Sequence, residues 1–173
     1  MAPGQRLSSY PSETAKQFNT EFTNRMTESA LKYGGKLVNR AGKGFACYFP
    51  DTSDRSNVEA FRNALLCSIE QLDKMGPLSY DMMRLRIPKT SYKICIDYET
   101  LSFETSEEEA INSPIGLPHL SKISWVAPGN VMGENLYMII SSSPELSRQF
   151  GTRKIGECII YPNTPPYSIY LYL

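Results

Sequence analysis

The chain has 173 residues with 18 basic and 18 acidic side chains, so its formal net charge is zero. This length suits one domain with a substantial core, and the balanced charge argues against electrostatic binding to DNA or to an anionic membrane surface. No apolar run approaches the roughly 20 residues that span a bilayer, and the N-terminus lacks the apolar segment of a signal peptide, so we expect a cytoplasmic protein.

The first predicted element is a long helix that starts at about Ser12 and runs to about Tyr33. Gly34 and Gly35 are expected to end it, because glycine readily takes the left-handed conformation found at helix C-termini. Apolar residues that recur every four positions give this helix one buried stripe, which consists of Phe18, Phe22, Met26 and Ala30.

A hairpin is predicted directly after this helix. Residues 36–41 are expected to form its first strand and residues 45–49 its second, since Gly42-Lys43-Gly44 between them is short and suited to a tight turn. Pro50 should end the second strand, because proline cannot donate a backbone hydrogen bond to a neighbouring strand.

The rest of the chain alternates between helices and strands. A helix from Val58 to about Met75 is expected to be broken by Gly76-Pro77 and followed by a connector over residues 78–88. Residues 92–104 alternate between apolar and polar side chains, which predicts one or two strands. The remaining predicted elements are a short helix at 119–126, a strand at 130–132, a helix at 133–140, a helical turn that starts at Ser143, and antiparallel strands at 157–161 and 167–173.

This order predicts an α/β (α+β) ferredoxin-like sandwich with a mostly antiparallel sheet and helices on one face. In that fold a strand precedes the first helix, but residues 1–11 contain no convincing strand. We therefore expect residues 1–11 to be disordered or truncated, and residues 12–173 to form a single domain whose first strand is missing or degenerate.

The four cysteines form no Cys-x-x-Cys pair, and His119 is the single histidine. Zinc ligands normally occur in pairs a few residues apart. A zinc site is therefore not expected, and the cysteines are interpreted as reduced residues of a cytosolic core.

The hairpin and its flanks resemble the metal-site hairpin of the class III nucleotidyl cyclases, the adenylate/guanylate cyclase catalytic domains. In that family a helix leads into Gly-Gly-Lys, a strand with a base-selecting Lys, the turn Gly-Asp-Gly, and an aromatic strand that ends in Phe-Pro. The matching residues here are Gly34-Gly35-Lys36, the turn at 42–44 and Phe49-Pro50.

Three later stretches are similar to the same family, so the resemblance covers most of the chain. Residues 92–98 resemble the strand that leads into the family's second hairpin. Residues 120–123 and 127–137 resemble a helix followed by the block of Pro, small residue, strand and Gly/Ser-Glu-x-x-Tyr. Residues 166–170 are similar to the last strand. The resemblance implies a cyclase-homology fold that pairs head to tail, as a homodimer or as a heterodimer with a cyclase homologue.

The family's catalytic metal site is not intact in this sequence. Cyclases use two metal ions held by two Asp residues to stabilise the attacking and leaving oxygens. The first Asp ends the strand that this chain lacks, and Lys43 occupies the position of the second. At ~4 Å and an effective dielectric of about 20, each repulsion between unit charges costs about 4 kcal/mol, so no metal cofactor is expected.

The other positions that the resemblance identifies are also altered. Pro118 stands where the family has an Asn that positions the ribose, and Lys122 stands where it has an Arg that stabilises the transition state. Lysine keeps the charge but not the bidentate geometry. Asn39 replaces the base-selecting Lys. Asn39 and Lys122 are thus the candidate nucleotide-binding residues for ATP or GTP, and no catalytic residue is intact.

Three hypotheses follow. The first is a degenerate cyclase-homology domain that acts in intracellular signalling without cyclase activity. The second is an active cyclase whose Mg²⁺ or Mn²⁺ has non-standard ligands, with Asp97 and Asp51 as candidates, or whose site is completed in a heterodimer. The third is a single-stranded RNA-binding module, because Lys43-Gly44-Phe45-Ala46 opens like the RNP1 signature, although the neutral charge counts against it.

Overall fold

The structure is a computed structural model that describes residues 12–38, 45–50, 58–87, 92–99, 123 and 130–173. Helix α1 spans Ser12–Lys32, close to the predicted bounds. Gly34 has a φ of 78°, and the amide of Gly35 donates to the carbonyl of Ala30 over 2.8 Å. The left-handed glycine therefore ends the helix as predicted.

The predicted hairpin is confirmed by two short antiparallel strands, β1 (Lys36–Leu37) and β2 (Cys47–Tyr48). Lys36 pairs with Tyr48 and Leu37 with Cys47. The amide of Val38 also donates to the carbonyl of Ala46 over 3.0 Å, which extends the pairing by one residue. The turn at 42–44 lies outside the described residues.

The predicted connector over residues 78–88 is wrong, because most of it is helical. Helix α2 spans Glu59–Asp73 and α3 spans Met75–Arg84, so Lys74 alone separates them. Pro77 lies in the first turn of α3. Backbone amides in the first turn have no hydrogen-bond acceptor within the helix, so the amide hydrogen that proline lacks is not needed there. The Gly-Pro pair therefore starts a second helix instead of ending helical structure.

Four strands form the main sheet: β3 (Ile94–Ile96), β4 (Asn130–Gly133), β5 (Thr152–Cys158) and β6 (Tyr167–Tyr172), in the spatial order β3-β4-β6-β5. Of the pairs in this sheet that the structure describes, β3 and β4 are parallel, and the other two are antiparallel. The pairing of β5 with β6 has an irregular register between Lys154 and Gly156. The strand predicted at 157–161 thus begins earlier, at Thr152, and ends at Cys158.

Helices α5 (Glu134–Ser142) and α6 (Pro144–Gln149) follow β4, as predicted. The Ser143 hydroxyl caps α6 by accepting the amide of Leu146, and Pro144 occupies the first turn. One face of the sheet packs against α2, α5 and α6. The buried residues of this core are Phe61, Leu65, Met132, Leu136, Ile140, Leu146, Phe150, Tyr170 and Tyr172.

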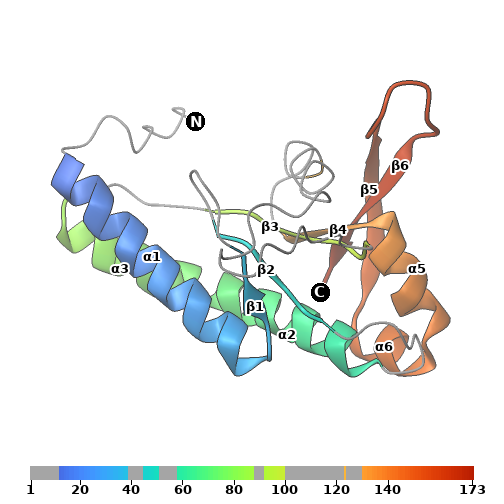
Figure 1. The fold of residues 1–173 in the computed structure, drawn as a ribbon, viewed down its shortest axis with the longest axis horizontal. Coiled ribbons are helices and arrows are strands. Elements are labelled where there is room, and N and C mark those ends of the chain that lie inside the picture. Colours follow the sequence, from blue (N-terminus) through green and yellow to red (C-terminus); the bar gives the residue numbers. More distant parts are fainter. Residues whose placement is uncertain (1–11, 39–44, 51–57, 88–91, 100–122, 124–129) are drawn as a thin grey trace, which may run out of the picture.

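The opposite face of the sheet has its own apolar cluster, because side chains alternate along each strand. It contains Ile123, Val131, Ile160 and Ile169. Ile123 is fully buried and helical, within a stretch that is otherwise outside the described residues. Figure 1 shows this sheet with α5 and α6 beside it, and β5 and β6 extending away from the long helices.

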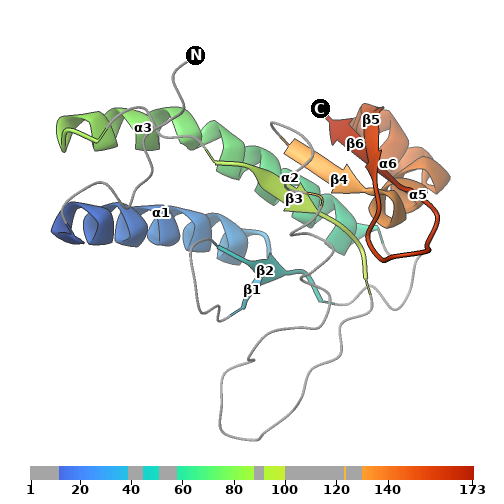
Figure 2. The ribbon, with the colours of Figure 1, turned by 90° about the horizontal axis from the view of Figure 1, so that it is seen from above.

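The long helices form a second layer, in which α1 lies alongside α2 and α3 in both views (Figures 1 and 2). The predicted stripe of α1 faces this contact, with Met26 and Ala30 buried, while Phe18 and Phe22 pack against a cluster of Leu78, Met82 and Ile87. In the part of the chain that the structure describes, no helix is both long and apolar enough to cross a membrane.

A group of charged side chains joins α1 to α2 around Glu70. Its carboxylate pairs with Lys32 and Lys74 and accepts hydrogen bonds from the hydroxyls of Tyr33 and Ser29, each over 3.1 Å. The Lys32 ammonium, aided by these other partners and opposed by burial, lowers the pKa of Glu70 from 4.5 to about 2. The ionised form of Glu70 therefore stabilises the folded state.

We expect Glu70→Gln to lower the free energy of unfolding at pH 7 by about 1–2 kcal/mol, a value reduced for the exposure of Lys32. Because the folded-state pKa is depressed, this contribution is present above about pH 4.5 and is lost as the pH falls towards 2. Urea denaturation of both proteins should therefore give curves that converge below pH 4.5.

The matched control is Glu28→Gln, since Glu28 is 75% exposed and pairs only with Lys74 among the described residues. Its effect should stay under about 0.5 kcal/mol at any pH. Equal losses in the two variants would contradict a specific role for Glu70.

Candidate functional site

The hairpin that carries the predicted site is held against the end of α1. Gly35 packs tightly between α1 and the end of the hairpin. A Cβ at this position would lie 3.0 Å from the carbonyl oxygen of Ala30 and 3.1 Å from the ring of Phe49, so a larger side chain would be crowded there. Val38, directly after β1, is buried. These contacts fix the path of the chain into the turn.

The residues predicted from the resemblance fall in stretches that the structure does not describe. Asn39 and Lys43 lie at 39–44, between the two paired strands of the hairpin, and Pro118 and Lys122 lie at 100–122. Asp51, the second ligand of the alternative metal hypothesis, also lies outside the described residues. Their roles remain predictions, and only the strands on either side of Asn39 and Lys43 are confirmed.

Asp97, the other candidate metal ligand, caps a helix. It follows β3 directly, and its Oδ1 accepts the amide of Leu136 in the first turn of α5 over 3.2 Å and the amide of Tyr98 over 2.9 Å. Its Oδ2 accepts the hydroxyl of Tyr167 over 2.6 Å. A carboxylate is well placed there, because a helix N-terminus has free amides and a partial positive charge.

Tyr167 links the same carboxylate to the helix a second time. Its hydroxyl donates to Asp97 and accepts the amide of Asn135 over 2.9 Å. Burial, followed by the negative charge of Asp97, raises the pKa of Tyr167 well above its usual range, so the phenol stays protonated. Two further side chains complete this polar cluster. The Glu134 carboxylate accepts the backbone amide of Ser168, and the Asn135 side-chain amide donates to the carbonyl of Tyr98.

This arrangement needs glycine at position 133, the residue before α5. A Cβ there would lie 2.0 Å from Oδ2 of Asp97, closer than real contacts allow. Gly133 also offers no side chain to cap the helix, so Asp97 supplies the cap from the neighbouring strand. The sequence gives one signal for this cap, which is that α5 begins after a glycine and so has no capping side chain of its own. It does not identify Asp97 as the cap, because Asp97 and Leu136 are far apart in the chain.

Among the described residues, Asp97 therefore accepts hydrogen bonds from the amides of Tyr98 and Leu136 and from the hydroxyl of Tyr167, and its part as a metal ligand stays a prediction. Among the described residues, no three His, Cys, Asp or Glu side chains lie close enough together to hold a metal ion. The ring of Phe49, at the end of the strand proposed to stack on RNA bases, lies 3.1 Å from the place that a Cβ on Gly35 would occupy. Neither alternative hypothesis gains a site from the described residues.

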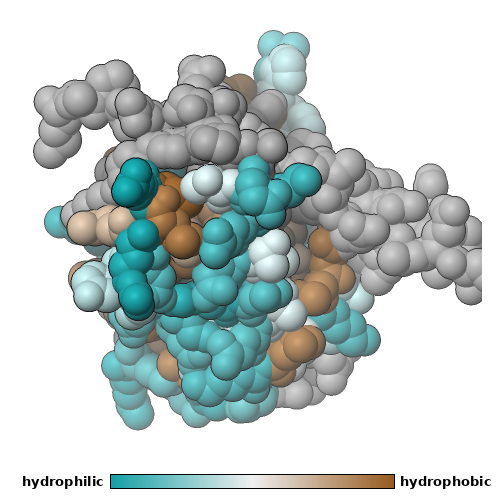
Figure 3. All heavy atoms as spheres, turned by 90° about the vertical axis from the view of Figure 1, so that its left-hand side faces the viewer, coloured by the Kyte–Doolittle hydropathy of each residue, from teal (hydrophilic) through white to brown (hydrophobic). Residues whose placement is uncertain are grey.

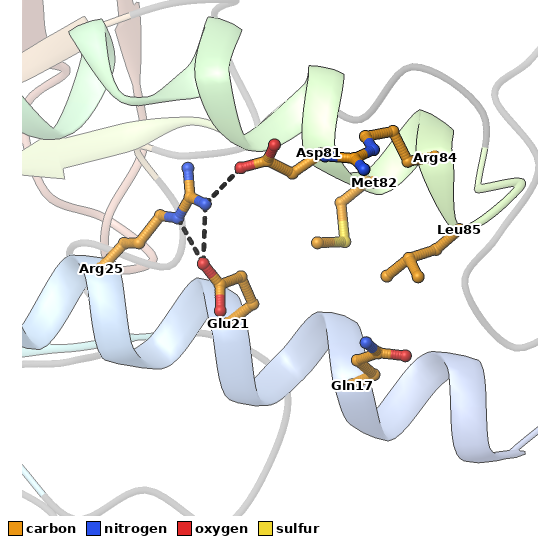
Figure 4. A pocket seen from close by; sticks show the side chains of 7 residues that line it. All are labelled: Gln17, Glu21, Arg25, Asp81, Met82, Arg84 and Leu85. Carbon is orange, nitrogen blue, oxygen red and sulfur yellow. Dashed lines mark hydrogen bonds and ion pairs between the residues drawn. The ribbon is translucent and has the colours of Figure 1, made fainter.

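A cavity lies between α1 and α3 (Figure 4). It has a volume of about 390 Å³ and is lined by Gln17, Glu21, Arg25, Asp81, Met82, Arg84 and Leu85. Arg25 bridges Glu21 over 2.7 Å and Asp81 over 2.5 Å, and this pairing raises the pKa of Arg25. Its charge is thus balanced within the cavity, and it ties the two helices together.

The surface around this cavity is mostly polar. Figure 3 views the end of the molecule where α1 begins, and hydrophilic residues cover most of the described surface there, with apolar residues showing in small areas. The cavity is lined by residues of the two helices and by Leu85 directly after α3, so it does not coincide with the hairpin that carries the predicted site.

Comparison by sequence finds no relative, since no protein-family model matches the chain and no curated protein matches it. Comparison by structure does. The adenylyl cyclase CyaB from P. aeruginosa superposes with a TM-score of 0.75 at 18% identity, over 96% of this chain and 85% of that chain. The guanylyl cyclase Cya2 gives 0.72 at 13% identity, over 94% and 82%.

The chain has the fold of a nucleotidyl cyclase domain. A bacterial light-regulated adenylyl cyclase agrees, with a TM-score of 0.69 at 11% identity over 96% of this chain and 47% of that chain. The predicted fold class is thereby confirmed. At these identities the similarity establishes the cyclase fold alone, and activity, metal and nucleotide have to be argued from the residues.

Proposed function

We propose that this chain is a degenerate cyclase domain that makes no cyclic nucleotide by itself and acts as an intracellular signalling or interaction module. The observation that carries the proposal is Lys43, which stands at the sequence position where the resemblance expects a metal-binding Asp. The antiparallel pairing of Lys36 with Tyr48 supports this alignment, because Lys43 then falls, by sequence, in the connection between the two strands of a hairpin.

The proposed partner is a second cyclase-type domain, either another copy of this chain or an active homologue. The support is the resemblance, in which the site forms between two subunits, together with the cyclase fold. In a heterodimer one subunit can supply the metal ligands while this chain supplies the opposite half of the site. ATP or GTP would then contact Asn39 and Lys122.

The test is a cyclase assay of the purified chain with ATP or GTP and either Mn²⁺ or Mg²⁺. We expect no product above the blank, because Lys43 repels divalent ions by about 4 kcal/mol for each pair of unit charges. Lys43→Asp should raise metal-dependent nucleotide binding in calorimetry, and Lys36→Asp, the same charge change on exposed β1, should not.

Cyclic nucleotide made by the unaltered chain, at a rate that Lys43→Asp does not improve, would refute the proposal. Activity would then favour the alternative of non-standard ligands. That alternative requires Asp97→Asn to abolish formation of the cyclic nucleotide while the protein stays folded. Folding has to be checked in this variant, because Asp97 also caps α5.

A further inference from the structure

The outer side of α3 carries two exposed apolar side chains. Tyr80 is 66% exposed and Met83 is 57% exposed. Residues three and four apart lie on the same side of a helix, so Tyr80, Met83 and Arg84 share one face of α3. Leu78 and Met82 occupy the opposite face, where they are buried. Figure 2 shows α3 at the edge of the molecule, with α1 along one of its sides.

Two arginines at the end of this face have no acidic partner among the described residues. Arg84 is the last residue of α3, Arg86 follows two positions later, and both are exposed. Arg84 also lines the cavity between α1 and α3. The acidic side chains of that cavity are Glu21 and Asp81, and both pair with Arg25 instead. The face therefore presents two uncompensated positive charges beside its apolar side chains.

The backbone at Arg86 is strained. Its φ is 60°, in the left-handed region that residues with a side chain rarely adopt. The amide of Arg86 donates to the carbonyl of Met83 over 3.0 Å, and the amide of Ile87 donates to the carbonyl of Met82 over the same distance. These two bonds form a Schellman motif, in which glycine is the usual residue at this position. An arginine there costs stability, and strained residues of this kind concentrate at functional sites.

We propose that the α3 face, which consists of Tyr80, Met83, Arg84 and Arg86, is a docking surface for an acidic segment of another protein. Carboxylates of that segment pair with the two arginines, and its apolar side chains pack on Tyr80 and Met83. Tyrosine, methionine and arginine are enriched at protein–protein interfaces, and arginine forms bidentate hydrogen bonds with carboxylates. The positive charge of the surface thus sets the negative charge of the partner.

The α3 face lies away from the β1–β2 hairpin. Its arginine end lies beside the start of α1, since Arg84 lines a cavity together with Gln17 and Glu21, whereas the hairpin follows the other end of α1. A helix of 21 residues is about 30 Å long. The inference therefore goes beyond the proposed cyclase-type function and does not depend on it.

A nucleic acid fits this surface less well than an acidic protein segment. The chain has 18 basic and 18 acidic side chains, and binding to a phosphate backbone draws on a larger positive surplus than two arginines supply. The exposed side chain of Met83 also offers an apolar contact, which suits an apolar side chain of a protein.

The experiment selects short random peptides, displayed on phage, against the full-length chain. We expect the selected peptides to combine Asp or Glu with Leu, Phe or Trp. A fluorescein-labelled copy should bind the chain in fluorescence anisotropy, with an affinity that falls as the salt concentration rises. A selection that enriches no acidic peptide, or one that enriches basic peptides, would overturn the proposal.

Matched variants locate the binding. Arg84→Ala and Met83→Ala should each weaken binding of the selected peptide by about tenfold or more. The controls are Arg148→Ala, which removes an exposed arginine from the last turn of α6, and Met138→Ala, which removes a methionine that is 58% exposed on α5. Equal losses of affinity in the controls would refute a specific surface on α3.

Arg86→Gly separates binding from stability. Glycine relieves the left-handed strain, so the Tm should rise by about 2–4 °C. The affinity for the peptide should nevertheless fall by about threefold or more, because one charge pair is lost. A rise in Tm with unchanged affinity would contradict the role of Arg86 in docking.

Two results would assign the α3 face to a different occupant. One is binding of a single-stranded RNA oligonucleotide that Arg84→Ala weakens as much as it weakens the peptide. The other is a dimer of the chain in analytical ultracentrifugation that Met83→Ala dissociates and Met138→Ala does not. Either result would overturn the choice of an acidic protein segment.

Discussion

Asp97→Ala is expected to lower the free energy of unfolding by about 3 kcal/mol. The substitution removes a carboxylate that accepts the amides of Tyr98 and Leu136 and the hydroxyl of Tyr167. Hydrogen bonds to a charged group contribute about 1.5–3 kcal/mol each, and the donors left behind are part-buried without an acceptor. For a chain of this size, the Tm should fall by about 6–12 °C.

Thermal and urea unfolding would measure this loss, with Asp73→Ala as the control. Asp73 is an exposed residue at the end of α2, so removal of the same carboxylate there should change stability by under about 0.5 kcal/mol. The loss of unfolding free energy in Asp97→Asn should lie between the losses in Asp97→Ala and Asp73→Ala, because the amide oxygen of Asn still accepts one or two of the hydrogen bonds but carries no charge. A loss below about 1 kcal/mol in Asp97→Ala would refute its role as the cap of α5.

Gly133→Ala should destabilise the protein by a similar amount, about 3 kcal/mol. The added methyl group would lie 2.0 Å from Oδ2 of Asp97, and the carboxylate cannot move aside without losing its bonds to Tyr167 and Leu136. Overpacking alone typically costs 1–3 kcal/mol, to which the lost hydrogen bonds add. The control is Gly76→Ala, where a Cβ meets nothing within 4 Å, and it should not destabilise the protein, since Gly76 lies in α3 and alanine favours a helix over glycine.

The two substitutions should not be additive. In a chain that already carries Asp97→Ala, the side chain that clashes with the new methyl group has gone, so Gly133→Ala should cost less than about 1 kcal/mol more. A double-mutant cycle by urea unfolding would measure the coupling, which we expect to be about 2 kcal/mol. Simple additivity would mean that the methyl group acts through the backbone and not through Asp97.

Elements that depend on local signals were predicted well. The four-residue apolar repeat of α1 and the left-handed Gly34 after it involve only neighbouring residues, and both are confirmed. The strand at Asn130 and the helix after it are confirmed for the same reason. The cyclase fold was also predicted, because the order of these elements and motifs was enough to indicate it.

Predictions failed where one local signal has two structural meanings. Gly76-Pro77 both ends a helix and suits the first turn of a new one, and only the packing of Leu78 and Met82 against α1 decides for the second. The start of β5 at Thr152 was missed because its first residues are exposed and do not alternate. Pairing with β6 makes them a strand.

The cap at Asp97 could not be predicted, because its partners come from three separate segments. Leu136 and Tyr167 are 39 and 70 residues away in sequence, and no short motif specifies such a contact. The sequence identified Asp97 only as a carboxylate after a strand. Lys43 and Lys122, which the resemblance did identify, lie outside the described residues and stay predictions.

The irregular register of β5 bears on how copies of this protein can associate. β5 is an edge strand, and an edge strand offers unpaired backbone groups to any other chain. Here the irregularity at Lys154 disturbs the regular backbone spacing that a new strand would need, and exposed Arg153, Lys154 and Glu157 place charges along it. Among the described strands, these two features disfavour the addition of a further strand to the β5 edge and therefore aggregation through it.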